Sequence, residues 1–99
     1  MRKTRTEVLD RNIVLVLRGD NGYNNSGFNN EIHMKDLLNS NVGTVFSAYN
    51  GGLRDSIEEV ATVIFKRDDG VALLIECTTA TDEPHPVVST EKRLVWIDF

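Results

Sequence analysis

The feature that most constrains this chain is a pair of strand-forming segments separated by a tight turn. Glu59–Arg67 and Val71–Thr79 are rich in β-branched and other apolar residues, and Asp68-Asp69-Gly70 lies between them. Segments of this kind, joined by Asp and Gly, are typical of antiparallel strands connected by a short turn. The sequence therefore predicts a β-hairpin, and the remaining elements must pack around it.

Two turn lengths can be compared for this hairpin, because the turn length sets which residues face each other. A two-residue turn, formed by Asp69 and Gly70, would bring Glu76 opposite Val63 on an otherwise apolar face. A three-residue turn separates the apolar and polar faces and gives Gly70 the positive φ angle of a bulged turn. We therefore predict the three-residue turn. It pairs Phe65 with Leu73, Val63 with Ile75 and Ala61 with Cys77.

Two segments before the hairpin also have clear patterns. Asn12–Arg18 contains a continuous apolar run with β-branched residues, which predicts a strand that is covered on both faces and is therefore central in the sheet. Glu31–Asn41 predicts a short helix, because its apolar residues have helical spacing. Asn29 or Asn30 can cap the start of this helix, and Asn41 can end it in a left-handed conformation.

The remaining segments predict further strands and their connections. Val42–Tyr49 predicts one strand, and Lys92–Phe99 predicts the last one. Ala80–Ser89 predicts a loop, since its two prolines hold the backbone extended. Residues 53–59 are compatible with two structures: a short helical turn, which we favour, or an extension of the strand that follows.

The length of 99 residues allows one domain, with residues 1–10 as a basic N-terminal arm. Apolar residues make up 40% of the chain and charged residues 26%, which indicates a globular rather than a disordered protein. We predict an α+β fold with a mainly antiparallel sheet of about five strands and one short helix. A small β-barrel with a helix is the alternative arrangement.

The sequence does not favour a membrane or a secreted protein. A membrane span needs about 20 consecutive apolar residues, whereas the longest runs, Ile13–Leu17 and Val71–Ile75, have five. Cys77 is the single cysteine, so an internal disulfide is excluded and a reducing compartment is favoured. We expect a cytoplasmic protein that binds no membrane, with Cys77 buried as a small apolar residue.

Charge is distributed unevenly along the chain, whose net charge is −4. Residues 1–19 carry five basic and two acidic residues, whereas residues 20–99 carry six basic and thirteen acidic residues. A basic arm can bind the phosphates of nucleic acid, and an acidic remainder can attract a basic partner surface. The candidate nucleic-acid-binding residues are Arg2, Lys3, Arg5 and Arg11.

Residues 20–30 predict an asparagine-rich loop that also contains two aromatic side chains. The two rings either pack back onto the core or stand out as contact residues. Long loops are often functional, and Tyr and Phe are common anchors of protein interfaces. The candidate partner-binding residues are Tyr23, Asn24, Asn25 and Phe28.

The sequence contains no pattern typical of catalysis or metal binding. Nucleophilic catalysis needs an oriented base, and His33 and His85 are the only imidazoles of the chain. His33 and Asp36 can share a helix face, but two ligands are too few for a metal site. We therefore predict no catalytic residue, no metal site and no cofactor.

These observations favour a non-enzymatic accessory or regulatory protein that acts by occupying a surface of a protein partner, as an inhibitor does. The first alternative is a nucleic-acid-binding protein that uses the basic arm, and the second is an enzyme of unfamiliar type. The last strand is expected at the edge of the sheet, where uncovered apolar strands tend to associate. We therefore also expect a homodimer, with Leu94 and Trp96 in the contact.

Overall fold

The computed structural model describes residues 13–19, 21–23, 30–52, 54–82 and 84–99. These residues form one short helix, α2 (Met34–Leu38), and two sheets. The small sheet pairs β1 (Ile13–Val16) with β3 (Glu31–His33). The large sheet consists of β2 (Asn21–Tyr23), β4 (Val45–Gly51), β5 (Asp55–Arg67), β6 (Gly70–Thr81) and β7 (Val87–Asp98).

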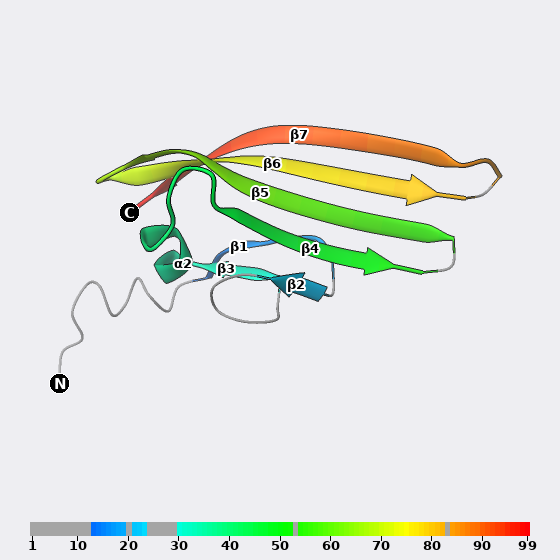
Figure 1. The fold of residues 1–99 in the computed structure, drawn as a ribbon, viewed down its shortest axis with the longest axis horizontal. Helices are drawn as coiled ribbons and strands as arrows, with labels where there is room; N and C mark the ends of the chain where they lie inside the picture. The colour runs from blue at the N-terminus through cyan, green and yellow to red at the C-terminus, as the bar shows by residue number, and fades with distance from the viewer. Residues whose placement is uncertain (1–12, 20, 24–29, 53, 83) are drawn as a thin grey trace.

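The large sheet is antiparallel throughout, and its strand order is β2-β4-β5-β6-β7. Strands β4 to β7 follow one another along the chain and form a meander (Figure 1). Within the described residues the sheet is open, with β2 at one edge and β7 at the other, so the alternative of a small barrel is wrong. The predicted α+β fold, a mainly antiparallel sheet with one short helix, is confirmed.

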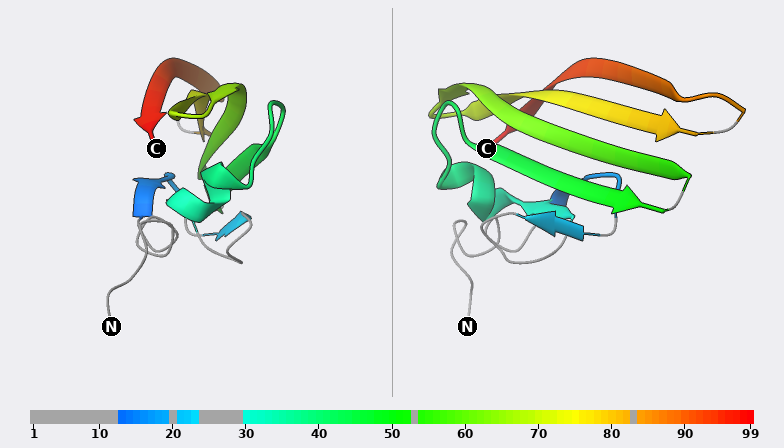
Figure 2. Two further views of the ribbon diagram at one scale, coloured as in Figure 1. Left: turned by 90° about the vertical axis from the view of Figure 1, so that its left-hand side faces the viewer. Right: turned by 45° about the vertical axis from the view of Figure 1, so that its right-hand side comes forward.

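The molecule is long and flat because β5, β6 and β7 have 13, 12 and 12 residues. Its principal extents are 57 × 27 × 15 Å. The small sheet and α2 lie against one face of the large sheet, near the end where β5 turns into β6 (Figure 1, Figure 2). We call this face the inner face and the opposite one the outer face. The other end of the meander extends beyond the small sheet and α2 (Figure 1).

The core lies between the inner face and the layer formed by the small sheet and α2. Alternate residues of a strand point to the same face, and Leu17, Ile32 and Leu37 pack against the inner-face residues from the opposite layer. The inner-face members of this core are Phe46, Ala48, Ala61, Val63, Val71, Leu73 and Ile75. Cys77 also points inward and is 7% exposed, which confirms its predicted burial.

The turn between β5 and β6 is shorter than the predicted one. Arg67 faces Gly70, so only Asp68 and Asp69 lie between the paired residues. Gly70 does not have a positive φ angle. Its lack of a side chain instead makes room for the ring of Trp96, with which an added Cβ atom would collide. The predicted three-residue turn is therefore wrong.

A β-bulge at Ile64 changes the register along the rest of the hairpin. On the β5 residues that precede the bulge, Val63 faces Leu73, not Ile75 as predicted. A shift of two positions keeps every side chain on the same face. The predicted inner face of the hairpin is therefore correct for the β5 residues that precede the bulge and for their partners in β6. Phe65 lies after the bulge and moves to the outer face, where it is 49% exposed. The other corrected pairs are Ala61 with Ile75 and Glu59 with Cys77.

A contact between β5 and the end of α2 explains the bulge. It turns Lys66 toward the inner face, where Nζ donates hydrogen bonds to the carbonyl oxygens of Leu38 at 2.7 Å and of Ser40 at 2.6 Å. The last carbonyl groups of a helix have no partner within the helix, and a lysine satisfies them well. The register of the hairpin therefore depends on a contact with a distant segment.

The helix begins later and is shorter than predicted. Glu31–His33 is extended as β3, and α2 comprises five residues. The backbone N–H of His33 donates to Oδ2 of Asp36 at 2.7 Å, so this pair marks the helix start in place of the predicted asparagine caps. After the helix, the residue with a positive φ angle is Gly43, at 98°, so the predicted left-handed Asn41 is wrong.

Three strands also differ from their predictions. β1 is not central in a sheet: it pairs with β3 alone among the described strands, and Ile13 and Val16 are 51% and 55% exposed. Residues 55–59 belong to β5, so the helical turn that we favoured is wrong and the strand extension is right. β7 begins earlier than predicted, at Val87, because it pairs with β6 as far as Thr81.

The crossing segment, Leu17–Gly19, carries the chain from the small sheet to the large one. The side-chain amide of Asn30 donates to the carbonyl oxygens of Leu17 and Gly19, each at 2.9 Å. Gly19 has a φ angle of 135°, and an added Cβ atom would lie 2.7 Å from the backbone nitrogen of Tyr49 in β4. The crossing segment is thus held between Asn30 and β4, and position 19 requires glycine.

The substitution Gly19→Ala is expected to lower the free energy of unfolding by about 3 kcal/mol or more, since backbone strain adds to the collision with β4. Gly43→Ala is the matched control, because its φ angle of 98° also disfavours alanine but no atom lies within 4 Å of the added carbon. The control should lose only about 1–2 kcal/mol. Urea denaturation followed by circular dichroism measures both, and equal losses would contradict the close approach of Gly19 to β4.

Candidate binding surface

The outer face of the large sheet carries a contiguous group of apolar side chains. Leu94 of β7 lies beside Leu74 of β6, and Trp96 lies beside Ala72. Phe65 of β5 faces Ala72 from the other side, and the centroids of the Phe65 and Trp96 rings are 6.5 Å apart. The outer patch, as we name this group, consists of Phe65, Ala72, Leu74, Leu94 and Trp96.

The largest side chains of the outer patch are exposed enough to contact another molecule. Their exposed fractions are 70% for Leu94, 49% for Phe65 and 44% for Trp96. Single exposed apolar residues are ordinary on a protein surface, whereas a contiguous group on neighbouring strands indicates an interaction surface. Acidic residues lie at both ends of the patch: Glu76 next to the leucines, and Asp98, which accepts a hydrogen bond of 2.7 Å from Nε1 of Trp96.

β7 forms an edge of the large sheet along its whole length. It pairs with β6 from Val87 to Asp98, and no strand of the described residues pairs with its other side. On the β6 side, the backbone N–H of Phe99 donates to the carbonyl oxygen of Asp69 at 2.9 Å. Because successive residues of a strand alternate in hydrogen-bonding direction, the even-numbered residues of β7 direct their N–H and C=O groups to the free side.

The structure places the predicted dimer-contact residues, Leu94 and Trp96, together on β7 and in the outer patch. The prediction that the last strand lies at a sheet edge is confirmed. The period-two pattern of the last strand predicted both residues, because they alternate along the strand with residues that point inward. Phe65 was missed as a surface residue, since the bulge that exposes it depends on Lys66 and the end of α2.

The other predicted binding residues are only partly described by the structure. Tyr23 lies in β2 and faces Ser47 of β4, so its backbone belongs to an edge strand rather than to a loop. The predicted contact residues Asn24, Asn25 and Phe28 lie outside the described residues. The same holds for the basic residues Arg2, Lys3, Arg5 and Arg11.

A small polar pocket of about 120 Å³ opens where the crossing segment passes over the inner face. The backbone N–H of Arg18 donates to Oε1 of Glu59 at 3.2 Å, and Nη1 of Arg18 lies 3.8 Å from Sγ of Cys77. Glu59 is 3% exposed, so the bond from Arg18 gives a buried carboxylate a donor. The pocket is also lined by Ile75, Glu91, Lys92 and Arg93, and none of its described lining residues has an imidazole that could activate the thiol. This arrangement holds the crossing segment to the sheet.

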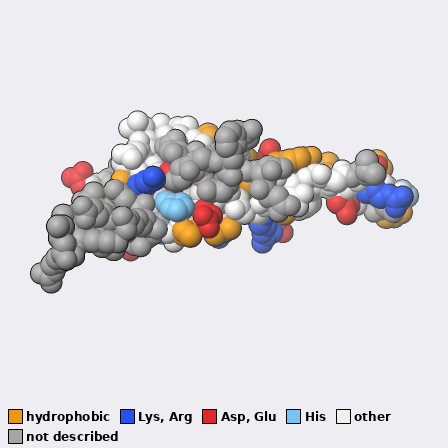
Figure 3. Space-filling model, turned by 90° about the horizontal axis from the view of Figure 1, so that it is seen from below, with side chains coloured by type: hydrophobic (Ala, Val, Ile, Leu, Met, Phe, Trp, Pro, Cys, Tyr) orange, Lys and Arg blue, Asp and Glu red, His pale blue; other side chains and the backbone are white. Residues whose placement is uncertain are grey.

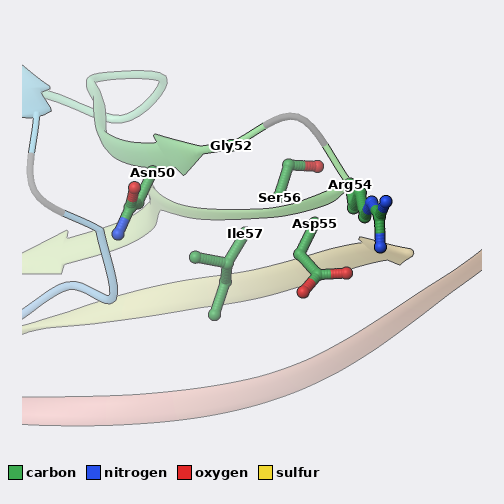
Figure 4. Close-up of a pocket in the computed structure, with 6 residues that line it drawn as sticks. All are labelled: Asn50, Gly52, Arg54, Asp55, Ser56 and Ile57. Carbon is green, nitrogen blue, oxygen red and sulfur yellow. The ribbon is translucent and has the colours of Figure 1, made fainter. Parts of the chain in front are cut away.

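A larger hollow lies at the end of the β4–β5 hairpin. It has a volume of about 730 Å³ and is lined by Asn50, Gly52, Arg54, Asp55, Ser56 and Ile57. Figure 4 shows Asp55 and Ile57 on one side of β5 and Ser56 on the other. Figure 3 shows basic and acidic side chains next to each other at this narrow end of the molecule. Among the described residues a single hairpin lines the hollow, so they do not supply the second wall with which a binding cleft encloses a ligand.

Further groups of residues were compared with known kinds of site. Among the described residues, no three His, Cys, Asp or Glu side chains are placed to hold a metal ion. In the same part of the chain, no helix is long and apolar enough to cross a membrane. Comparison with protein-family models, with curated proteins and with solved structures finds no match for this chain.

The substitution Glu59→Ala is expected to lower the free energy of unfolding by about 2 kcal/mol, because the partly buried N–H of Arg18 loses its acceptor. Glu59→Gln keeps an oxygen acceptor and should lose about half as much or less. Glu58→Ala is the control: this neighbour is exposed, and the change should stay within about 0.5 kcal/mol. Equal unfolding midpoints for Glu59→Ala and Glu58→Ala in urea would show that the buried carboxylate does not hold the crossing segment.

Proposed function

We propose that this protein is a non-enzymatic accessory or regulatory module that binds a protein partner through the outer patch. The observation that carries the proposal is the contiguity of Phe65, Leu94 and Trp96 with their neighbours across three strands, with exposed fractions from 44% to 70%. Aromatic and large aliphatic side chains at the centre of an interface supply most of its binding energy. The patch therefore fits a partner that offers a matching apolar surface.

Charge narrows the class of partner. Asp98 lies at one end of the outer patch, and at the other end Oε2 of Glu76 lies 3.8 Å from Nζ of Lys92. Residues 20–99 carry thirteen acidic and six basic residues. A partner with basic side chains around an apolar centre is attracted over a long range and is oriented by these charges. The proposed partner is therefore a basic protein surface with an apolar centre, which the module covers as an inhibitor does.

The proposal includes self-association through β7. No strand of the described residues pairs with the N–H and C=O groups on its free side, and its Leu94 and Trp96 are exposed. A long edge strand associates with another strand unless charges, prolines or bulges protect it. In β7 the charged residues Glu91, Lys92 and Arg93 are grouped at the centre, with Val87 and Val88 on one side and Leu94–Ile97 on the other, before the terminal Asp98. Homodimer formation would place the outer patches of two copies near each other.

Substitutions in the outer patch test the proposed function with a partner captured from native lysate and then purified. Phe65→Ser and Leu94→Ser should each weaken binding by about tenfold or more, because an interface anchor contributes at least about 1.4 kcal/mol. Val42→Ser is the matched control: Val42 is 64% exposed but lies outside the patch, and its affinity should change by less than about twofold. Isothermal titration calorimetry measures the affinities, and unchanged melting temperatures show that the variants fold.

Tyr23→Ala in the same assay distinguishes the outer patch from the asparagine-rich loop. Weaker binding of Tyr23→Ala, together with unchanged binding of Phe65→Ser, would place the contact at the loop instead. If the captured partner is a nucleic acid whose affinity falls steeply with salt, the basic arm is the binding element and the outer patch is not.

A further inference from the structure

The sequence of β7 distinguishes among the ways in which the strand can pair with itself. Two identical antiparallel strands related by a two-fold axis bring residues at equal distances from the axis opposite each other. When the axis is perpendicular to the sheet, opposed residues lie on the same face, so the inner faces of the two copies join. The even-numbered residues, which direct their N–H and C=O groups to the free side, form the new hydrogen bonds. Each register is then defined by the residue that lies on the axis.

We infer that β7 binds the β7 strand of a second copy of this chain in the register that places Lys92 on the two-fold axis. The inference rests on the proposed self-association and gives it a geometry. In this register Glu91 faces Arg93 of the second copy, and by symmetry Arg93 faces Glu91 of the second copy. Opposite charges directly across two strands stabilise their pairing. The charged centre of β7, which would repel many other strands, is thus complementary to itself.

The same register covers the exposed apolar residues at both ends of β7. Val88, which is 69% exposed, faces Trp96 of the second copy on the outer face. Val87, which is 51% exposed, faces Ile97 of the second copy on the inner face. Each contact occurs twice in the dimer, and aromatic and β-branched pairs of this kind are favourable across strands. Pairing therefore extends over nearly the whole strand.

The neighbouring registers lose these features. With Arg93 on the axis, two arginines meet and Glu91 faces Val95. With Glu91 on the axis, two glutamates meet. With Leu94 on the axis, Arg93 faces Val95, and Val88 has no residue of β7 opposite it because the strand ends at Asp98. Only the register centred on Lys92 combines opposed opposite charges with apolar pairs at both ends.

The two lysines that meet on the axis are each accompanied by a carboxylate. Nζ of Lys92 lies 3.8 Å from Oε2 of Glu76 on the neighbouring strand, and the Lys92 side chain is 63% exposed. The charges across the dimer then follow the order Glu76, Lys92, Lys92 and Glu76. Each lysine is partly neutralised by its own Glu76, and the single lysine pair is outnumbered by the two Glu91–Arg93 pairs and the apolar contacts. The outer patches of the two copies lie on the same side of the joined sheet.

Single-cysteine variants in a Cys77→Ala background test the register in the full-length chain. Lys92→Cys places two thiols opposite each other, with Cα atoms about 5.5 Å apart, within the range of a disulfide. Thr90→Cys and Leu94→Cys are the matched controls, because each thiol is about 14 Å along the strands from its copy, at four residues' rise. Under mild oxidation we expect the Lys92→Cys variant to form covalent dimer at least about tenfold faster than either control.

Sedimentation equilibrium of the wild-type protein separates the register from the association itself. A monomer at about 100 μM would overturn both the inference and the proposed self-association, while partner binding by the outer patch is measured independently. A dimer whose fastest cross-link occurs in Thr90→Cys or Leu94→Cys would overturn the register alone.

A charge exchange provides a second test of the same pairing. Glu91→Arg places like charges opposite each other and should raise the dimer dissociation constant by about tenfold or more. The double variant Glu91→Arg with Arg93→Glu restores opposite charges across the axis and should return the constant to within about threefold of wild type. If both variants dimerise equally weakly, Glu91 does not face Arg93 of the second copy.

Discussion

The hydrogen bonds that hold the crossing segment, Leu17–Gly19, to Asn30 and to the large sheet are the constraint on which the rest of the structure depends. A segment that connects two packed sheets must find partners for its partly buried N–H and C=O groups, since an unpaired buried group is costly. The side-chain amide of Asn30 donates to the carbonyl oxygens of Leu17 and Gly19. The carboxylate of Glu59 accepts a hydrogen bond from the backbone N–H of Arg18. These bonds account for two features that are otherwise hard to explain: a carboxylate that is 3% exposed, and a glycine against β4.

The sequence predicted the fold best where a pattern is local. Period-two alternation indicated the two strands of the hairpin, the inner position of Cys77 and the exposed Leu94 and Trp96 of the last strand. It did not indicate the bulge, because the bulge follows from bonds between Lys66 and the end of α2, 28 and 26 residues away. Phe65 was therefore assigned to the wrong face, and with it a central residue of the outer patch was missed.

Two further errors have a common physical origin. The apolar run of β1 was interpreted as a strand covered on both faces, yet only its middle residues, Val14 and Leu15, pack on the core. Asn30 was interpreted as a helix cap, although its amide bonds to the crossing segment. In both cases the residue type was recognised correctly as apolar or as a backbone-bonding side chain. Its partner lies elsewhere in the chain, and local spacing carries no information about that partner.

The distribution of contacts along the chain also orders the steps by which the molecule folds. β4 to β7 are consecutive and joined by short turns, so their pairing requires little loop-closure entropy. The bond between Arg18 and Glu59, by contrast, joins residues 41 positions apart. The meander is therefore expected to form early and to wait for the small sheet and α2 to dock. Until they do, the inner-face side chains are uncovered in addition to the free side of β7, and this transient species is the one most prone to aggregate.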